Sequence, residues 1–143
     1  MNPLSKNDIR VLFVEDDPDQ IFLYQEVFGM KGIFLIPSTN SKETMEAAIK
    51  NKPSVILLDI LLRHENGLDI MEKLKSNSAT KNIPIIIFTN YDKKEVRDRA
   101  AELGAMAFII KSRTTPQEMT EKVKALVSIP HSYDDAGESI AEN

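Results

Sequence analysis

Residues 55–59 read VILLD, four apolar residues in a row followed directly by an aspartate. A strand with one solvated face alternates apolar and polar residues, whereas an unbroken apolar run fits a strand that is covered on both faces. Strands of this kind are typical of parallel sheets with helices on each side. The stretch therefore predicts an α/β sheet, with Asp59 at the carboxyl end of a buried strand.

Four similar runs lie outward from this one, and the segments between them carry helix signals. The five expected strands span residues 11–14, 33–36, 55–58, 85–88 and 107–110. From caps, prolines and capping boxes, helix starts are expected at Asp17-Pro18, Asn40 with Glu43, Gly67, Asp92 with Glu95, and Thr115-Pro116. Five strands that alternate with five helices predict a doubly wound parallel sheet with right-handed crossovers.

The composition fits one compact domain, since 42% of the 143 residues are hydrophobic and 28% are charged. The formal charge of −4 comes from the end of the chain: residues 129–143 hold four acids and no Lys or Arg, which leaves 18 acids and 18 bases in residues 1–128. We therefore expect a domain over residues 1–128 and an acidic, mobile tail over residues 129–143. The neutral body argues against direct binding to nucleic acid.

The sequence also limits where the protein acts. It contains no cysteine, which excludes disulfides and thiolate metal sites. The first ten residues lack the apolar run of a signal peptide, and no apolar segment reaches the roughly 18 residues that span a bilayer. The sequence therefore predicts a cytoplasmic protein that does not enter a membrane.

Polar side chains follow four of the expected strands. Glu15 and Asp16 follow the first strand, Asp59 follows the third, Thr89 ends the fourth and Lys111 follows the fifth. Taken singly, each has an ordinary explanation as a helix cap, a strand-end hydroxyl or a solvated charge. Because the carboxyl ends of parallel strands meet at one edge of a sheet, their joint occurrence favours a shared site.

The chemistry of these groups indicates a cation and a phosphoryl group. Two carboxylates about 4 Å apart repel by roughly 4 kcal/mol at an effective dielectric near 20, so Glu15, Asp16 and Asp59 need a cation between them. Hard oxygen ligands without Cys or His favour Mg²⁺ or Mn²⁺ over zinc. With Lys111 and Thr89 opposite, the site suits a phosphoryl group, which Asp59 can accept as an acyl phosphate.

Four segments, in order and with matching spacing, resemble the receiver domain of bacterial and archaeal response regulators of two-component systems. They read VLFVEDDP (11–18), ILLDILLRHENG (56–67), IIIFTN (85–90) and GAMAFIIKS (104–112). The resemblance covers residues 9 to about 127 and includes the intervals from Asp59 to Gly67 and from Thr89 to Lys111. It implies a flavodoxin-like (βα)5 fold with strand order 2-1-3-4-5.

The resemblance also implies the roles of the acidic residues. Asp59 is the nucleophile that takes the phosphoryl group from a sensor histidine kinase or a histidine phosphotransfer protein, and becomes the phosphoaspartate. Asp16 and Asp59 bind Mg²⁺ directly, Glu15 binds it through water, and the backbone carbonyl of Leu61 supplies a further ligand. Asp17 is the helix cap and lies outside this ligand set. Such a protein is not a conventional enzyme, because it catalyses its own phosphorylation and slow dephosphorylation.

The remaining implied roles concern signalling. Thr89 and Lys111 bind phosphoryl oxygens, and Phe108 is the aromatic switch that turns inward as Thr89 moves. No output domain is expected after residue 128, so the signal must pass to another protein or to a second copy of this one. The expected contact face consists of the fourth helix, fifth strand and fifth helix. The basic group on that helix, read as solvated, comprises Lys93, Lys94, Arg97 and Arg99.

Several positions depart from the family pattern. Ser112 follows Lys111 where the family has a proline after a cis bond, and a cis bond before serine costs about 3 kcal/mol, which leaves the geometry of this bond open. Arg63 replaces the usual proline, and Asn90 is larger than the usual small residue. These changes motivate one alternative, a pseudo-receiver that binds partners without phosphorylation.

Leu61 and Tyr91 lie two residues beyond Asp59 and Thr89, where the family controls the approach of water. Both are bulky, and neither can orient a water molecule, so we predict slow self-dephosphorylation. A second alternative, a Mg²⁺-dependent phosphatase with an aspartyl nucleophile, needs an acid at the position of Leu61. His64 is interpreted as a solvated loop residue.

Overall fold

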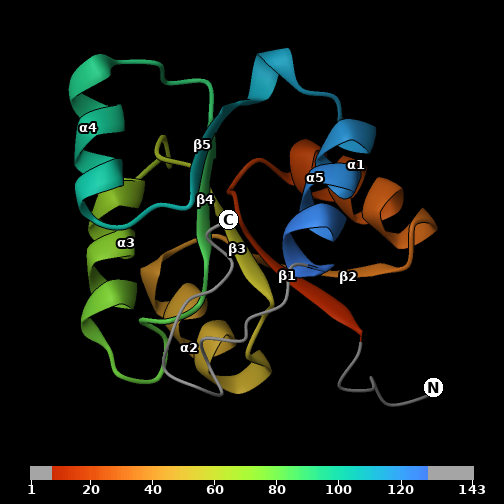
Figure 1. Cartoon of the computed structure of the whole chain (residues 1–143), viewed down its shortest axis with the longest axis horizontal. Coiled ribbons are helices and arrows are strands. Elements are labelled where there is room, and N and C mark those ends of the chain that lie inside the picture. Colours follow the sequence, from red (N-terminus) through yellow and green to blue (C-terminus); the bar gives the residue numbers. More distant parts are fainter. Residues whose placement is uncertain (1–7, 129–143) are drawn as a thin grey trace.

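The computed structural model describes residues 8–128, so the expected tail at residues 129–143 lies outside the described part of the chain. Within this described part, five strands alternate with five α-helices (Figure 1). The strands are β1 (Ile9–Val14), β2 (Ile33–Ser38), β3 (Val55–Leu58), β4 (Ile85–Thr89) and β5 (Ala107–Ile110). The helices are α1 (Pro18–Met30), α2 (Ser41–Asn51), α3 (Gly67–Ser76), α4 (Lys94–Glu102) and α5 (Pro116–Ser128), with a short 3-10 turn, η1 (Lys111–Arg113), before α5.

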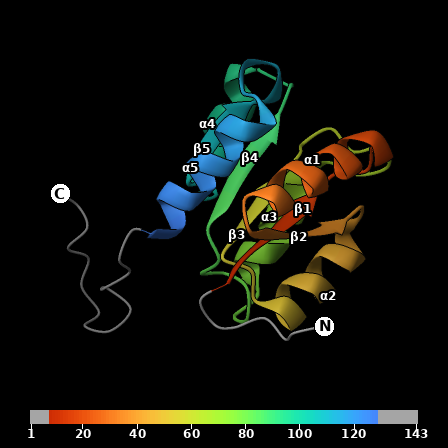
Figure 2. The same cartoon turned by 90° about the vertical axis from the view of Figure 1, so that its right-hand side faces the viewer.

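All strand pairs are parallel, and the order in the sheet is β2-β1-β3-β4-β5. Both the fold class and the strand order predicted from the sequence are therefore confirmed. Helices α1 and α5 cover one face of the sheet, and α2, α3 and α4 cover the other (Figures 1 and 2). Among residues 8–128, no helix is both long and apolar enough to cross a membrane.

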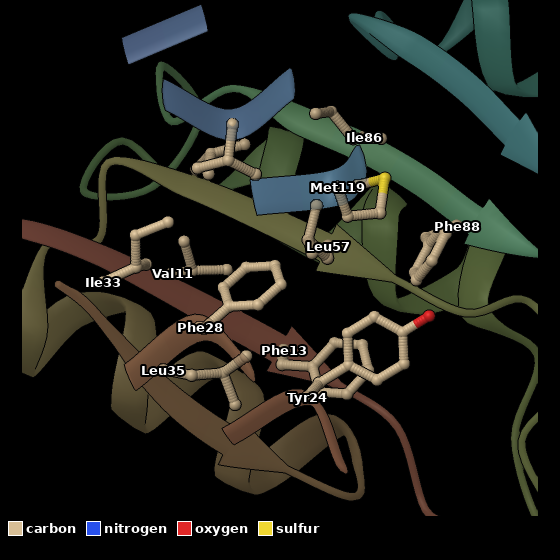
Figure 3. Packing of buried hydrophobic residues seen from close by; sticks show 12 residues of the cluster. Val11, Phe13, Tyr24, Phe28, Ile33, Leu35, Leu57, Ile86, Phe88 and Met119 are labelled. Atoms are coloured by element: carbon tan, nitrogen blue, oxygen red, sulfur yellow. The ribbon is translucent and has the colours of Figure 1, made fainter. Parts of the chain in front are cut away.

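The alternating side chains of the strands feed two separate cores. In β1, Val11 and Phe13 belong to the core beneath α1 and α5, whereas Leu12 and Val14 belong to the core beneath α2, α3 and α4. Strand β3 is buried throughout, because both of its faces are covered. Figure 3 shows the first core, in which side chains from the sheet pack against α1 and α5. The unbroken apolar runs of the sequence follow directly from this double coverage.

Most predicted helix starts are observed. Asp17 caps α1, Asn40 caps α2, and Thr115 forms a reciprocal capping box with Glu118 at the start of α5. The predicted start at Asp92 is wrong, because Lys93 is the residue before α4 and makes no capping hydrogen bond. The carboxylate of Asp92 instead pairs with the guanidinium of Arg97, an ion pair that replaces the backbone cap.

Candidate functional site

The ends of β1 and β3 bring two buried carboxylates together at the carboxyl edge of the sheet. The backbone N–H of Glu15 donates to the carbonyl of Ser38, and that of Asp59 donates to the carbonyl of Val14, at 3.0 and 3.1 Å. These bonds extend the sheet ladder by one residue beyond each strand, which fixes both positions. Glu15 is only 3% exposed and Asp59 only 7%. Ionised carboxylates at such depth require a positive partner.

Lys111, at the end of β5, is that partner. Its Nζ lies 2.8 Å from Oδ2 of Asp59 and also forms an ion pair with Oε1 of Glu15. Burial alone would lower the pKa of Lys111, but the charges and hydrogen bonds of the two carboxylates outweigh it, so the net pKa is raised. Burial raises the pKa of Glu15, although Lys111 opposes this effect. One ammonium group therefore serves two buried acids.

Asp16 lies at the rim of the same site. Its Oδ2 accepts a hydrogen bond from the backbone N–H of Arg63 at 2.6 Å, which ties the end of β1 to the loop after β3. The side chain of Asp17 caps α1, while its backbone N–H donates to Oε2 of Glu15 at 3.0 Å. The groups border one cleft of about 530 Å³, lined by Glu15, Asp16, Asp17, Gln20, Tyr24, Asp59, Leu61, Arg63, Asn90, Lys111 and Ser112.

Gly67, eight residues beyond Asp59, is required by the close packing of this loop. A Cβ atom at Gly67 would lie 2.1 Å from the backbone oxygen of Asp59, and the N–H of Gly67 donates to the carbonyl of Ile60 at 2.9 Å. Beside it, the N–H of Leu61 donates to Oδ1 of Asp59 at 3.0 Å and fixes that carboxylate. The first turn of α3 thus rests directly on the backbone of the central aspartate.

The donor set fits a hard divalent cation, although it is not arranged as a closed metal site. Within residues 8–128, no three His, Cys, Asp or Glu side chains are grouped so as to hold a metal ion. Two contacts account for this: Lys111 lies on both Glu15 and Asp59, and Asp16 turns toward the N–H of Arg63. Four carboxylates and two cationic side chains, Lys111 and Arg63, line the cleft, which leaves an excess of negative charge there. Oxygen donors of this kind suit Mg²⁺ or Mn²⁺.

Comparison with known proteins agrees with this geometry. The family model of the response regulator receiver domain matches residues 11–124, which include every acidic residue of the cleft and Lys111. The chain belongs to this family. It is therefore a receiver domain of the two-component systems.

Curated relatives of this receiver domain include two kinds of response regulator. It is 29% identical over 107 residues to the polar-differentiation response regulator DivK of Brucella anthropi, covering 75% of this chain and 87% of DivK. It is 26% identical over 117 residues to the phosphate regulon transcriptional regulatory protein PhoB of Pseudomonas aeruginosa. That match covers 82% of this chain and 51% of PhoB, so the chain spans about half of PhoB.

Solved structures support the same assignment. A signal receiver domain of a signal transduction histidine kinase from Syntrophus aciditrophicus superposes with a TM-score of 0.72 at 26% identity, covering 83% of this chain and 89% of that one. A CheY-like response regulator receiver domain protein from Methanospirillum hungatei gives a TM-score of 0.75 at 23% identity, covering 83% and 93%. At 23% identity, the similarity to the Methanospirillum hungatei protein shows a shared fold alone.

Two residues expected at the receiver site do not border the cleft in this structure. Thr89 is fully buried, and its Oγ1 accepts a hydrogen bond from the N–H of Tyr91 at 3.2 Å. Phe108 is partly buried and packs against the core beneath α2, α3 and α4. Leu61, in contrast, is exposed and borders the cleft, and His64 is exposed in the adjoining loop, as expected for a solvated residue.

Asn90 and Ser112, two positions that depart from the receiver pattern, are hydrogen-bonded to each other. Residues 8–128 contain no cis peptide bond, so the bond between Lys111 and Ser112 is trans. The N–H of Ser112, which a proline would lack, donates to Oδ1 of Asn90 at 2.7 Å. The carboxylate of Asp92 also lies 3.7 Å from the guanidinium of Arg113. Two polar links thus join the loop after β4 to the loop that carries Lys111, and sequence reasoning missed both.

Proposed function

We propose that this receiver domain accepts a phosphoryl group on Asp59, from a sensor histidine kinase or a histidine phosphotransfer protein, with Mg²⁺ or Mn²⁺ in the acidic cleft. The observation that carries the proposal is the contact of Lys111 with both Glu15 and Asp59. It joins three strand ends in one charged site. Membership of the response regulator receiver family also supports phosphorylation of Asp59.

In this mechanism an oxygen of Asp59 attacks phosphorus while the bond from phosphorus to the imidazole nitrogen of the donor breaks. The imidazole leaves with the electron pair, and Asp59 becomes an acyl phosphate. Glu15, Asp16, Asp59 and the carbonyl of Leu61 would hold the cation, which supplies charge neutralisation at the phosphoryl oxygens. Lys111 then exchanges its carboxylate contacts for a phosphoryl oxygen.

Arg63 adds positive charge at the mouth of the cleft. Its side chain is exposed, borders the cleft, and makes no ion pair or hydrogen bond with the rest of residues 8–128. A free guanidinium in this place attracts an incoming anionic phosphodonor. A proline at this position, as in most of the family, would lack that charge.

The switch residues act after phosphorylation. The hydroxyl of Thr89, which now accepts from the N–H of Tyr91, moves to donate to a phosphoryl oxygen, and Phe108 follows the movement of Thr89. Leu61 and Tyr91 offer water no acid or amide for its orientation, so self-dephosphorylation is slow. These roles extend the family pattern to residues of this chain.

Output through α4, β5 and α5, to a downstream protein or to a second copy in the cytoplasm, completes the proposal. On α4, Lys94 pairs with Asp98, Arg97 with Asp92, and Arg99 with Glu72, and all three basic side chains stay exposed. Ion pairs this exposed contribute little to stability and exchange readily with a partner's acids. This face therefore suits a protein contact.

The test is phosphorylation by acetyl phosphate with Mg²⁺, measured by intact-mass spectrometry on the wild type and on Asp59→Asn. We expect one phosphoryl group per wild-type molecule, none on the variant, and none when a chelator removes Mg²⁺. A wild type that takes up no phosphate would instead favour the pseudo-receiver. In that case the contacts of Lys111 with Glu15 and Asp59 would only stabilise the fold. Hydrolysis of small phosphate esters would favour a phosphatase, although Leu61 offers no general acid.

A further inference from the structure

Tyr24, in the middle of α1, has a ring that belongs to the core and a hydroxyl that does not. The ring packs against Phe13, Phe28 and Phe88, with centroids 5.1, 6.0 and 5.6 Å away (Figure 3). The residue is only 3% exposed. In the sequence, Tyr24 falls on one apolar stripe of α1 with Ile21, Val27 and Phe28, which accounts for the ring. A phenylalanine would serve that packing equally well.

The hydroxyl of Tyr24 has no hydrogen-bond partner among residues 8–128, although the residue borders the acceptor cleft. A buried hydroxyl without a partner destabilises the fold, so such a group needs an explanation. In Figure 3 the hydroxyl points out of the aromatic cluster. Because the ring is packed in the core, the hydroxyl is the part of Tyr24 that can border the cleft lined by Lys111 and Glu15.

The electrostatic surroundings of the hydroxyl agree with this position. Burial raises its pKa, while the charge of Lys111 lowers it and that of Glu15 raises it, so both charges act on the phenol oxygen. The group therefore stays protonated near neutral pH. A neutral phenol can accept one hydrogen bond and donate another, and both possibilities are unused in the structure.

We propose that Tyr24 is a positioning residue for the divalent cation, with its hydroxyl accepting a hydrogen bond from a water molecule of the cation's hydration shell. This role rests on the proposed function, because it requires a cation in the cleft. Protein-bound Mg²⁺ keeps several of its waters, and each bound water needs an acceptor. The carboxylates of Asp16 and Asp59 would bind the cation itself and Glu15 would accept one of its waters. Tyr24 adds a neutral acceptor that is fixed by its packed ring.

The experiment compares Mg²⁺ binding to the wild type and to Tyr24→Phe by isothermal titration calorimetry with MgCl₂ alone. The variant keeps the ring and loses only the hydroxyl. We expect its Mg²⁺ affinity to fall about three- to tenfold, as for the loss of one hydrogen bond. In chelator, its urea midpoint should equal or exceed that of the wild type, because an unsatisfied buried group has been removed.

Thr80→Val is the matched control, since Thr80 is also fully buried and carries a hydroxyl. There the hydroxyl donates to the carbonyl of Leu74 at 2.6 Å, before the amino end of β4. We expect the opposite pattern: a lower urea midpoint and unchanged Mg²⁺ affinity.

Equal Mg²⁺ affinity in the wild type and Tyr24→Phe would overturn the inference while leaving the proposed function intact. A wild type that binds no Mg²⁺ would overturn both.

Discussion

Among residues 8–128, Lys111 is the one cationic side chain that pairs with the buried Glu15 and Asp59, so its removal tests the electrostatics of the site. In metal-free protein at pH 8, Lys111→Met should lower the free energy of unfolding by about 3 kcal/mol, because two buried carboxylates lose their partner. The measurement is urea unfolding in chelator.

The sign of the pH dependence follows from the pKa shifts. The raised pKa of Lys111 means that its contribution is present at neutral pH and is lost only above its folded pKa, beyond 10.5. Burial raises the pKa of Glu15 above 4.5, so this carboxylate loses its negative charge as the pH falls toward that range. The loss in Lys111→Met should therefore shrink toward pH 4. The same loss at pH 4 and pH 8 would argue against this pairing.

Arg63 should affect the approach of the phosphodonor rather than the fold. Arg63→Gln is expected to slow phosphorylation by acetyl phosphate about three- to tenfold at low ionic strength, because a free guanidinium leaves the mouth of the cleft. The difference should narrow in about 1 M salt, where exposed charges are screened. A rate unchanged at low salt would mean that the guanidinium lies too far from the donor to act.

At the residue scale, sequence patterns predicted the charged centre and missed its neutral neighbours. Glu15, Asp59 and Lys111 could be placed together because each directly follows a run of four apolar residues in the sequence. The role of the Tyr24 hydroxyl was missed because helical spacing indicates only that the ring is packed. The same spacing results whether or not the hydroxyl has a partner. Asp92 was wrongly predicted to cap a helix. Its carboxylate pairs with Arg97 instead of with backbone N–H groups, and residue spacing does not reveal this competition.

At the element scale, the junction of β3 and α3 depends on a missing side chain. Gly67→Ala should lower the free energy of unfolding by about 2 kcal/mol or more, since the new Cβ would meet the backbone oxygen of Asp59 at 2.1 Å. Gly29→Ala is the control: nothing lies within 4 Å of its Cβ, so this helical position should gain up to about 1 kcal/mol. Urea unfolding distinguishes them, and a neutral Gly67→Ala would mean that the junction yields easily.

The loops after β4 and β5 should behave as coupled elements through Asn90 and Ser112. Asn90→Ala is expected to cost about 0.5–1 kcal/mol of unfolding free energy, because the N–H of Ser112 loses its acceptor. In a Ser112→Pro background that N–H is absent, so Asn90→Ala should cost nothing. A double-mutant cycle measures the coupling, and equal costs in both backgrounds would exclude it.

The helix starts show what local sequence can and cannot predict. Thr115 with Glu118 and Asp17 before Pro18 predicted their helices because both partners lie within one turn. The link between Asn90 and Ser112 joins residues 22 positions apart. It becomes visible only when neighbouring strands bring the two loops together, so no local pattern indicates it.

At the scale of the whole molecule, the doubly wound sheet was predictable because each strand contains a run of four apolar residues and these runs alternate with helix signals. The two cores divide the side chains of each strand between the faces of the sheet, which leaves polar groups only at the strand ends. The site follows from this architecture, since parallel strands deliver their carboxyl ends to one edge. The state of the switch was not predictable, because Thr89 and Phe108 depend on packing across β4, β5 and α4.

The central claim is that Asp59 itself carries the phosphoryl group. Wild-type protein treated with acetyl phosphate and Mg²⁺ should be reduced with borohydride, which converts an aspartyl phosphate to homoserine, and then mapped by peptide mass spectrometry. We expect homoserine at position 59 and no reduction at any other acidic residue of the cleft. Homoserine at position 16, the corresponding alcohol at position 15, or no reduction product at all would contradict phosphorylation of Asp59.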